Sequence, residues 1–140
     1  MRTIFFGVVA GFGLLLAAGP VAAHHAFNSE FDANKPVKVR GTVSKVEWIN
    51  PHAWIHIDVK KPDGTIEKWM FETGTPNTLM RRGLTKNSLA IGTEVVADGY
   101  QSKDGLCDPA CRANGRDMTL PSGQTLLLGA GGGAGGGTAP

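Results

Sequence analysis

The chain has 140 residues, and its 14 Lys and Arg side chains against 12 Asp and Glu give a formal net charge of +2 at pH 7. This near-neutral balance argues against a dedicated nucleic-acid binder, which usually carries a basic patch or stripe. A chain of this length has room for one modest hydrophobic core, so we expect a single folded domain.

The first part of the chain, residues 1–23, has the pattern of a secretory signal peptide. One positive charge at Arg2 precedes the apolar stretch 4–18, and small residues end the segment at Ala23. The apolar stretch is shorter than the roughly 20 residues that cross a bilayer, and no lipid-accepting cysteine follows it. We therefore expect cleavage after Ala23, a periplasmic or secreted location, and a mature chain that begins at His24 and does not insert into the membrane.

An N-terminal arm, residues 24–36, is expected before the first strand. Apolar and polar residues alternate over 37–43, which predicts a strand with one buried face. The apolar series then shifts by one position and continues at Val46 and Trp48. A shift of this kind is typical of a β-bulge, one extra residue that bends a strand, so we expect a long bent strand that ends near residue 48.

The next two strands are predicted as a hairpin. Residues 53–60 alternate between apolar and polar positions after a turn at 49–52. Pro62, Asp63 and Gly64 favour a tight turn, and a third strand is expected over 66–72.

A short helix is predicted after the hairpin. Thr75 places a capping hydroxyl ahead of Pro76, which suits the first helical position, and Gly83 is a typical residue at a helix end. A fourth strand over 93–100 and a closing hairpin over 116–128 complete the domain. The glycine-rich tail 129–140 has no side chain able to bury apolar area, and we expect it to be disordered.

This order of elements is that of an OB-type barrel, which has five strands and one short helix. The sequence therefore predicts a mainly β fold, a small five-stranded OB-like antiparallel barrel over residues 37–128. Another small β-barrel or an open antiparallel sheet would show the same alternation.

Several short motifs resemble those of one protein family. HHAF followed by EFD, then GTVSKVEWINPH, KWMFE, LMRRG and RANGR, are similar to a family of small exported bacterial proteins known only as a domain of unknown function. The resemblance spans residues 24–128 and implies an envelope location and a β-rich fold, but no activity. The chain departs from the family pattern at GLCDPAC, residues 105–111, and in its glycine-rich tail.

All four histidines lie in two short clusters, His24 with His25 and His52 with His56. If His24 is the mature N-terminus, its amine and imidazole are free to chelate copper as in histidine-brace proteins, because such nitrogens suit Cu(II). His25 and His52 are the candidates for further ligands. His56 is four residues from His52 along a strand, about 13 Å away, which is too far for the same ion. The alternative is that the terminal histidines are exposed and mobile and that His52 bonds to the backbone of its turn.

A site that joins His24 to His52 would require the arm 24–36 to return along the first strand. This strand would be about 40 Å long if straight, and an extended arm just spans that distance. Phe27 and Phe31 of a folded arm would bury their rings against the sheet.

Three tryptophans, Trp48, Trp54 and Trp69, are candidates for an aromatic platform that binds a sugar or another ligand on the barrel face, as OB-type domains often do. Core packing is the alternative for tryptophans in so small a domain.

Cys107 and Cys111 enclose only Asp-Pro-Ala. In an oxidising compartment this spacing favours a local disulfide, with a copper or redox pair as the alternative.

No catalytic motif is found in the sequence. A Gly-x-Ser-x-Gly elbow, an HExxH motif and a phosphate-binding glycine loop are all missing. Glu47, Asp58, Glu72 and Asp98 fall at polar positions of predicted strands, where solvated side chains are expected. The sequence therefore predicts a non-enzymatic binding or accessory module for a protein or small ligand of the cell envelope. The alternative is a copper-binding protein for metal handling or oxidative chemistry.

Overall fold

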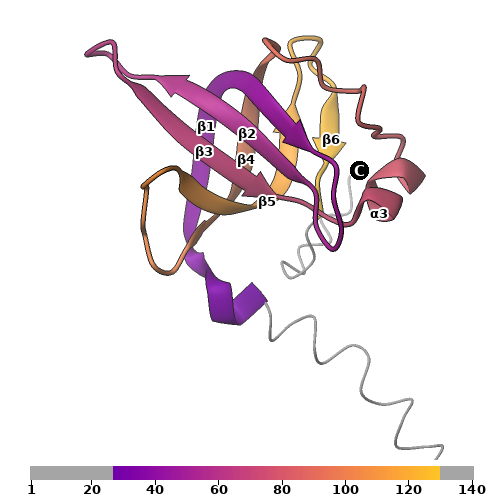
Figure 1. The fold of residues 1–140 in the computed structure, drawn as a ribbon, viewed down its shortest axis with the longest axis horizontal. Coiled ribbons are helices and arrows are strands. Elements are labelled where there is room, and N and C mark those ends of the chain that lie inside the picture. Colours follow the sequence, from indigo (N-terminus) through magenta and orange to yellow (C-terminus); the bar gives the residue numbers. More distant parts are fainter. Residues whose placement is uncertain (1–26, 130–140) are drawn as a thin grey trace, which may run out of the picture.

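In the computed structural model, which describes residues 27–129, the chain forms a six-stranded sheet with a short helix beside it (Figure 1). The predicted signal peptide, His24, His25 and the tail beyond residue 129 lie outside the described residues. Within the described range, no helix is long and apolar enough to cross a membrane. The elements are β1 (Phe31–Glu47), β2 (Trp54–Lys60), β3 (Ile66–Glu72), α3 (Pro76–Arg81), β4 (Glu94–Ser102), β5 (Cys111–Thr119) and β6 (Thr125–Leu127).

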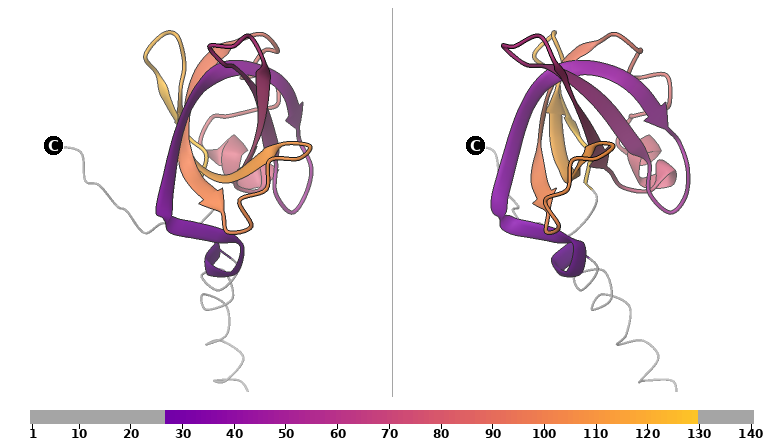
Figure 2. Two further views of the ribbon diagram at one scale, coloured as in Figure 1. Left: turned by 90° about the vertical axis from the view of Figure 1, so that its left-hand side faces the viewer. Right: turned by 60° about the vertical axis from the view of Figure 1, so that its left-hand side comes forward.

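Five of the strands close into a ring. Strand β1 pairs with β4 along its first part and with β2 along its last part. Strand β3 pairs with β2 on one side and with β5 on the other, and β5 pairs back to β4. Figure 2 shows the strands curling around a common interior. The predicted mainly β, OB-like fold is confirmed, with two additions: β3 and β5 run parallel, and β6 adds a sixth strand beside β5.

Two local features allow β1 to bend. Its register with β2 shifts between Val43 and Lys45, which is the predicted bulge. Gly41 approaches β2 so closely that a Cβ atom there would lie 2.5 Å from the carbonyl oxygen of Asp58, a distance that real Cβ atoms do not reach. The missing side chain therefore lets β1 cross from β4 to β2 at short range.

The inward faces of the strands build one hydrophobic core. Helix α3 joins this core through Leu79, and its first turn is fixed by the Thr75 hydroxyl, which accepts a hydrogen bond from the Thr78 backbone N–H at 3.1 Å, as the capping pattern predicts. Alternation along β2 and β3 sends every second side chain inward. The buried side chains of these two strands are Ile55, Ile57, Trp69 and Phe71.

The start of the domain differs from the predicted separate arm, because β1 already begins at Phe31 and follows one helical turn at residues 27–30. Phe27 and Phe31 are both buried, as expected for an arm that packs on the sheet. Their rings stack with centroids 5.9 Å apart, and Phe27 meets the ring of Tyr100 in β4 edge-on at 5.8 Å. This small aromatic cluster fixes the entry of the chain into the barrel.

Replacing Phe31 by alanine should lower the free energy of unfolding by about 3 kcal/mol, because the substitution leaves a cavity under the aromatic cluster. Urea denaturation at fixed pH measures this change. Ile91→Ala is the control, since Ile91 is 65% exposed and its loss should change stability by less than about 0.5 kcal/mol. Equal stabilities of the two variants would show that the first residues of β1 do not belong to the cooperative fold.

Candidate functional site

The outward face of β2 and β3 carries a pocket. The strand register places His56 opposite Met70 and Asp58 opposite Lys68 on this face. The loop of residues 103–110, between β4 and β5, contributes a further wall. Together they form a pocket of about 310 Å³, the His56 pocket, which is lined by Ser44, Lys45, His56, Asp58, Lys68, Trp69, Met70, Pro109 and Ala110.

His56 supplies the most buried polar atom of the pocket. Its side chain is 19% exposed, and its Nε2 atom is buried without a hydrogen-bond partner among the described residues, with a carboxylate oxygen of Glu47 3.6 Å away. Burial lowers the pKa of His56 below its usual value, and the nearby Glu47 carboxylate opposes part of that effect. The ring is therefore neutral at pH 7, with one nitrogen that donates and one that accepts. Buried polar atoms are nearly always bonded in proteins, and the nearest polar group to this Nε2 atom is the Glu47 carboxylate.

Two opposite charges lie beside His56 in the pocket. Asp58 and Lys68 are neighbours across β2 and β3, and neither forms a salt bridge with another residue of the described range. Lys45 differs from them, because its ammonium group is bonded to Glu47. The pocket thus presents an unpaired carboxylate, an unpaired ammonium group and a neutral imidazole.

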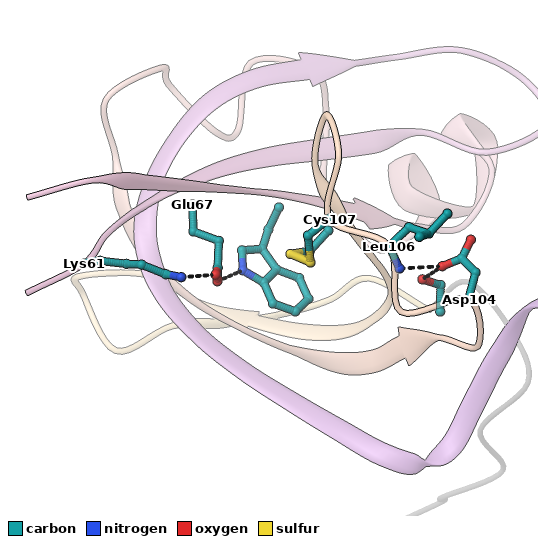
Figure 3. Close-up of a disulfide and its surroundings, with 8 residues drawn as sticks. Lys61, Glu67, Asp104, Leu106 and Cys107 are labelled. Carbon is teal, nitrogen blue, oxygen red and sulfur yellow. Dashed lines mark hydrogen bonds and ion pairs between the residues drawn. A yellow bond between two sulfur atoms is a disulfide. The ribbon is translucent and has the colours of Figure 1, made fainter. Parts of the chain in front are cut away.

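The loop that covers the pocket carries the predicted disulfide, with the sulfur atoms of Cys107 and Cys111 1.99 Å apart. Cys111 is buried at the first position of β5, whereas Cys107 is an exposed loop residue. Figure 3 shows Cys107 between two groups of side chains, Lys61 with Glu67 on one side and Asp104 with Leu106 on the other. The disulfide therefore joins the exposed part of the loop to the barrel wall.

The three tryptophans do not form a common platform. Trp69 is only 7% exposed and pairs with the inward residue Ile57, whereas Trp54 lies on the outward face and pairs with Glu72. Trp48, just after β1, packs against the core. Strand alternation sends residues 54 and 69 to opposite sides of the sheet, so these two tryptophans do not share one face.

A second group of polar side chains surrounds the β1–β2 turn. The Nδ1 atom of His52 lies 2.9 Å from the carbonyl oxygen of Thr73 and 3.6 Å from a carboxylate oxygen of Glu72. We assign the ring proton to Nδ1, because a carbonyl oxygen only accepts, and this leaves the Nε2 lone pair of His52 free. Burial raises the pKa of Glu72, and the nearby His52 opposes this rise.

Arg112 connects this second group to the first described residues of the chain. Its guanidinium lies 5.8 Å from the ring centroid of Trp54, and one of its nitrogens lies 3.4 Å from a carboxylate oxygen of Glu30. The negative charge of Glu30 also raises the pKa of Glu72, after the larger effect of burial. The chain therefore enters the barrel near the β1–β2 turn, because β1 curls around the barrel. The entry of the chain and the β1–β2 turn are therefore not separated by the length of about 40 Å that a straight first strand would have.

Two of the four carboxylates that were expected to be solvated are buried. The side chains of Glu72 and Asp98 are each only 12% exposed. Asp98 forms ion pairs with Lys38 at 3.3 Å and with Arg116 at 3.5 Å. Their long side chains cover the carboxylate, which explains why a polar strand position is not solvated here.

The structure describes only one of the predicted metal ligands. His52 is described, whereas His24 and His25 lie outside residues 27–129. Within that range, no group of three or more His, Cys, Asp or Glu side chains is arranged to hold a metal ion. His52 and His56 contact different residues, as expected from their separation along the chain.

Part of the His56 pocket can be predicted from the sequence. The Pro-Asp-Gly turn fixes the register of the β2–β3 hairpin, and that register places Asp58 opposite Lys68 on the outward face. No local sequence pattern indicates that residues 103–110 cover this face. The RANGR motif likewise does not indicate that Arg112 contacts the ring of Trp54. These features depend on the long-range pairing of β3 with β5.

Comparison with known proteins gives a match to one family model and a match to a solved structure. The model of a family of unknown function, DUF6152, matches residues 13–110, a range that includes the HHAF and NPH motifs and ends before RANGR. No curated protein shows significant similarity to the chain. One matching solved structure is the N-terminal domain of the PriB protein from Thermoanaerobacter tencongensis, described as dimeric. It is 18% identical, with a TM-score of 0.39, over 62% of this chain and 96% of that one.

An NMR titration of the histidine ring signals should show that His56 titrates below the usual histidine value of 6.5. Glu47→Gln should move this midpoint lower still, because the carboxylate favours the charged ring. A depressed pKa in the folded state means that the unfolded chain binds the proton more readily. Stability should therefore decrease as the pH falls from 6.5 through the midpoint of His56. A midpoint above 6.5 would contradict the burial of this ring.

Proposed function

The chain belongs to DUF6152, a family of unknown function, and we propose that it is an exported, non-enzymatic binding module that holds a small ligand in the His56 pocket. The observation that carries this proposal is a pocket of about 310 Å³ lined by Asp58 and Lys68, neither of which forms a salt bridge with another described residue. That volume lies at the lower end of the range of roughly 300–1,000 Å³ typical of small-molecule sites.

The lining of the pocket favours an amphiphilic ligand. Met70 and Pro109 offer apolar contact to the body of such a molecule. The unpaired Asp58 and Lys68 offer an ion pair to an amine or to a carboxylate. A ligand with one charged group on a small apolar body satisfies both kinds of contact.

A binding role fits His56 better than a catalytic one. Catalytic histidines are paired with the group whose proton they move, and a third group orients them. Among the described residues, no partner lies within hydrogen-bond distance of the Nε2 atom of His56. We therefore assign no chemical step to the ring.

Export to the periplasm or the medium is supported by two features. Residues 1–23 have the charge and hydropathy pattern of a signal peptide. The Cys107–Cys111 disulfide fits the same location, because disulfides persist in oxidising compartments and are rare in the cytosol. The ligand would then come from the cell envelope or the medium.

We expect 3-phenylpropionate and phenethylamine to bind this pocket with dissociation constants on the order of a millimolar, as small ligands of this size do. Amide shifts in ¹⁵N NMR spectra should move mainly in β2, β3 and residues 103–110. Lys68→Met should weaken binding of the carboxylate but not of the amine, and Asp58→Asn should do the reverse. Lys60→Met is the matched control on an exposed position of β2. Shifts that map to another face, or that do not saturate, would overturn the proposed site.

Copper binding at the mature N-terminus is a second candidate function, favoured by the orientation of His52. The contact of its Nδ1 with the Thr73 carbonyl oxygen is the arrangement that usually supports a metal-binding histidine, whose other nitrogen faces the ion. The described chain also enters the barrel near this turn, since Glu30 contacts Arg112 beside Trp54. These contacts support a short path from His24 to His52.

Titration calorimetry with Cu(II) on the exported, tag-free protein tests this candidate. His24→Ala and His52→Ala should each weaken binding by about tenfold or more, whereas His56→Ala should have little effect. Affinity should fall as the pH decreases from about 8 to about 5, because the amine and the imidazole must lose protons to bind. Binding no tighter than that of a free HHAF peptide would exclude a preorganised site.

A further inference from the structure

The loop of residues 103–110 is held in two different ways along its length. Its first half is fixed by hydrogen bonds, since a carboxylate oxygen of Asp104 accepts from the Ser102 hydroxyl at 2.7 Å and from the Leu106 backbone N–H at 3.1 Å. In its second half, Asp108 and Pro109 form no hydrogen bond or ion pair with other residues of the described range. This second half is enclosed by the Cys107–Cys111 disulfide.

The second half of the loop is also the part that forms the pocket wall. Pro109 and Ala110 line the His56 pocket. Cys107, Asp108 and Pro109 also line a second hollow of about 400 Å³ beside Lys61. Asp108 and Pro109 are exposed and form no hydrogen bond with other described residues, so their position depends on the disulfide that encloses them. Because Cys107 is exposed and lines this second hollow, a small thiol can approach the disulfide from solvent.

Closure of the barrel does not depend on this disulfide. The pairing of β3 with β5 begins at Trp69↔Cys111 and continues to Glu72↔Asn114, past the cross-link. Strand β5 is also paired with β4 over Gln101↔Ala113 and beyond. Reduction would therefore release the loop and leave the ring of strands in place.

We propose that the Cys107–Cys111 disulfide is a redox switch for the His56 pocket, an inference that rests on the binding function proposed above. The oxidised form holds Pro109 and Ala110 against the outward face of β2 and β3. A dithiol reductant breaks the S–S bond through a mixed disulfide: two electrons and two protons pass to the cysteines, and the reductant closes to its own disulfide. The released wall becomes mobile, and the ligand then binds more weakly because the pocket is no longer preorganised.

¹⁵N NMR relaxation tests the release of the loop. The purified oxidised protein is compared with the same protein in dithiothreitol. The backbone order parameters of Cys107, Asp108 and Ala110 should fall on reduction, whereas those of β3 and β4 should stay unchanged. The variant with Cys107→Ser and Cys111→Ser should have the order parameters of the reduced protein and should not respond to dithiothreitol. Unchanged order parameters in these three residues overturn the switch, and so does a fall throughout the barrel, which would make the disulfide a general structural cross-link.

Binding of 3-phenylpropionate to the same samples tests whether release of the loop weakens ligand binding. Reduction, or the double serine variant, should weaken binding about fivefold or more. A more mobile loop with unchanged affinity overturns the switch but leaves the proposed binding site intact. Failure of both 3-phenylpropionate and phenethylamine to bind even the oxidised protein overturns the proposed function, and with it the regulation of binding by the disulfide. The two failures are therefore distinguishable.

Discussion

The whole barrel depends on β1, which must pair with β4 and with β2 at once. A straight strand cannot do so, because the two partners lie on different sides of the ring. The bend becomes possible where Gly41 brings the two backbones together without a Cβ atom, and where the bulge after Val43 adds twist. The same bend carries Glu30 to Arg112, so the start of the domain and the β1–β2 turn share one region of the surface.

Alternation along β2 links the core to the proposed site. Ile55 and Ile57 point inward and are fully buried, and the side chains between and beyond them, His56 and Asp58, point outward into the pocket. A rigid core strand therefore holds the polar groups of the pocket in fixed positions, which suits a binding site. The Nε2 atom of His56 is buried with the Glu47 carboxylate 3.6 Å away, so this ring too is held in one orientation beside the pocket.

The two described histidines have opposite arrangements. His52 bonds a backbone carbonyl through Nδ1 and leaves Nε2 free, the arrangement suited to a metal ligand. His56 buries Nε2 near the Glu47 carboxylate, and its ring forms part of the wall of a pocket proposed for an organic ligand. Their separate roles in the two candidate functions follow from these surroundings, because the side chains themselves are identical.

The sequence by itself determined the local features of this protein. The strand alternation, the bulge, the Pro-Asp-Gly turn, the Thr75 cap and the burial of Phe31 each depend on residues close together in the chain or on hydrophobicity alone. Only the tertiary structure decided that β3 pairs with β5, that Trp69 lies inside the barrel, and that the disulfide loop covers His56. These features arise from contacts between segments far apart in sequence, and a local pattern carries no information about which distant segment will supply the contact.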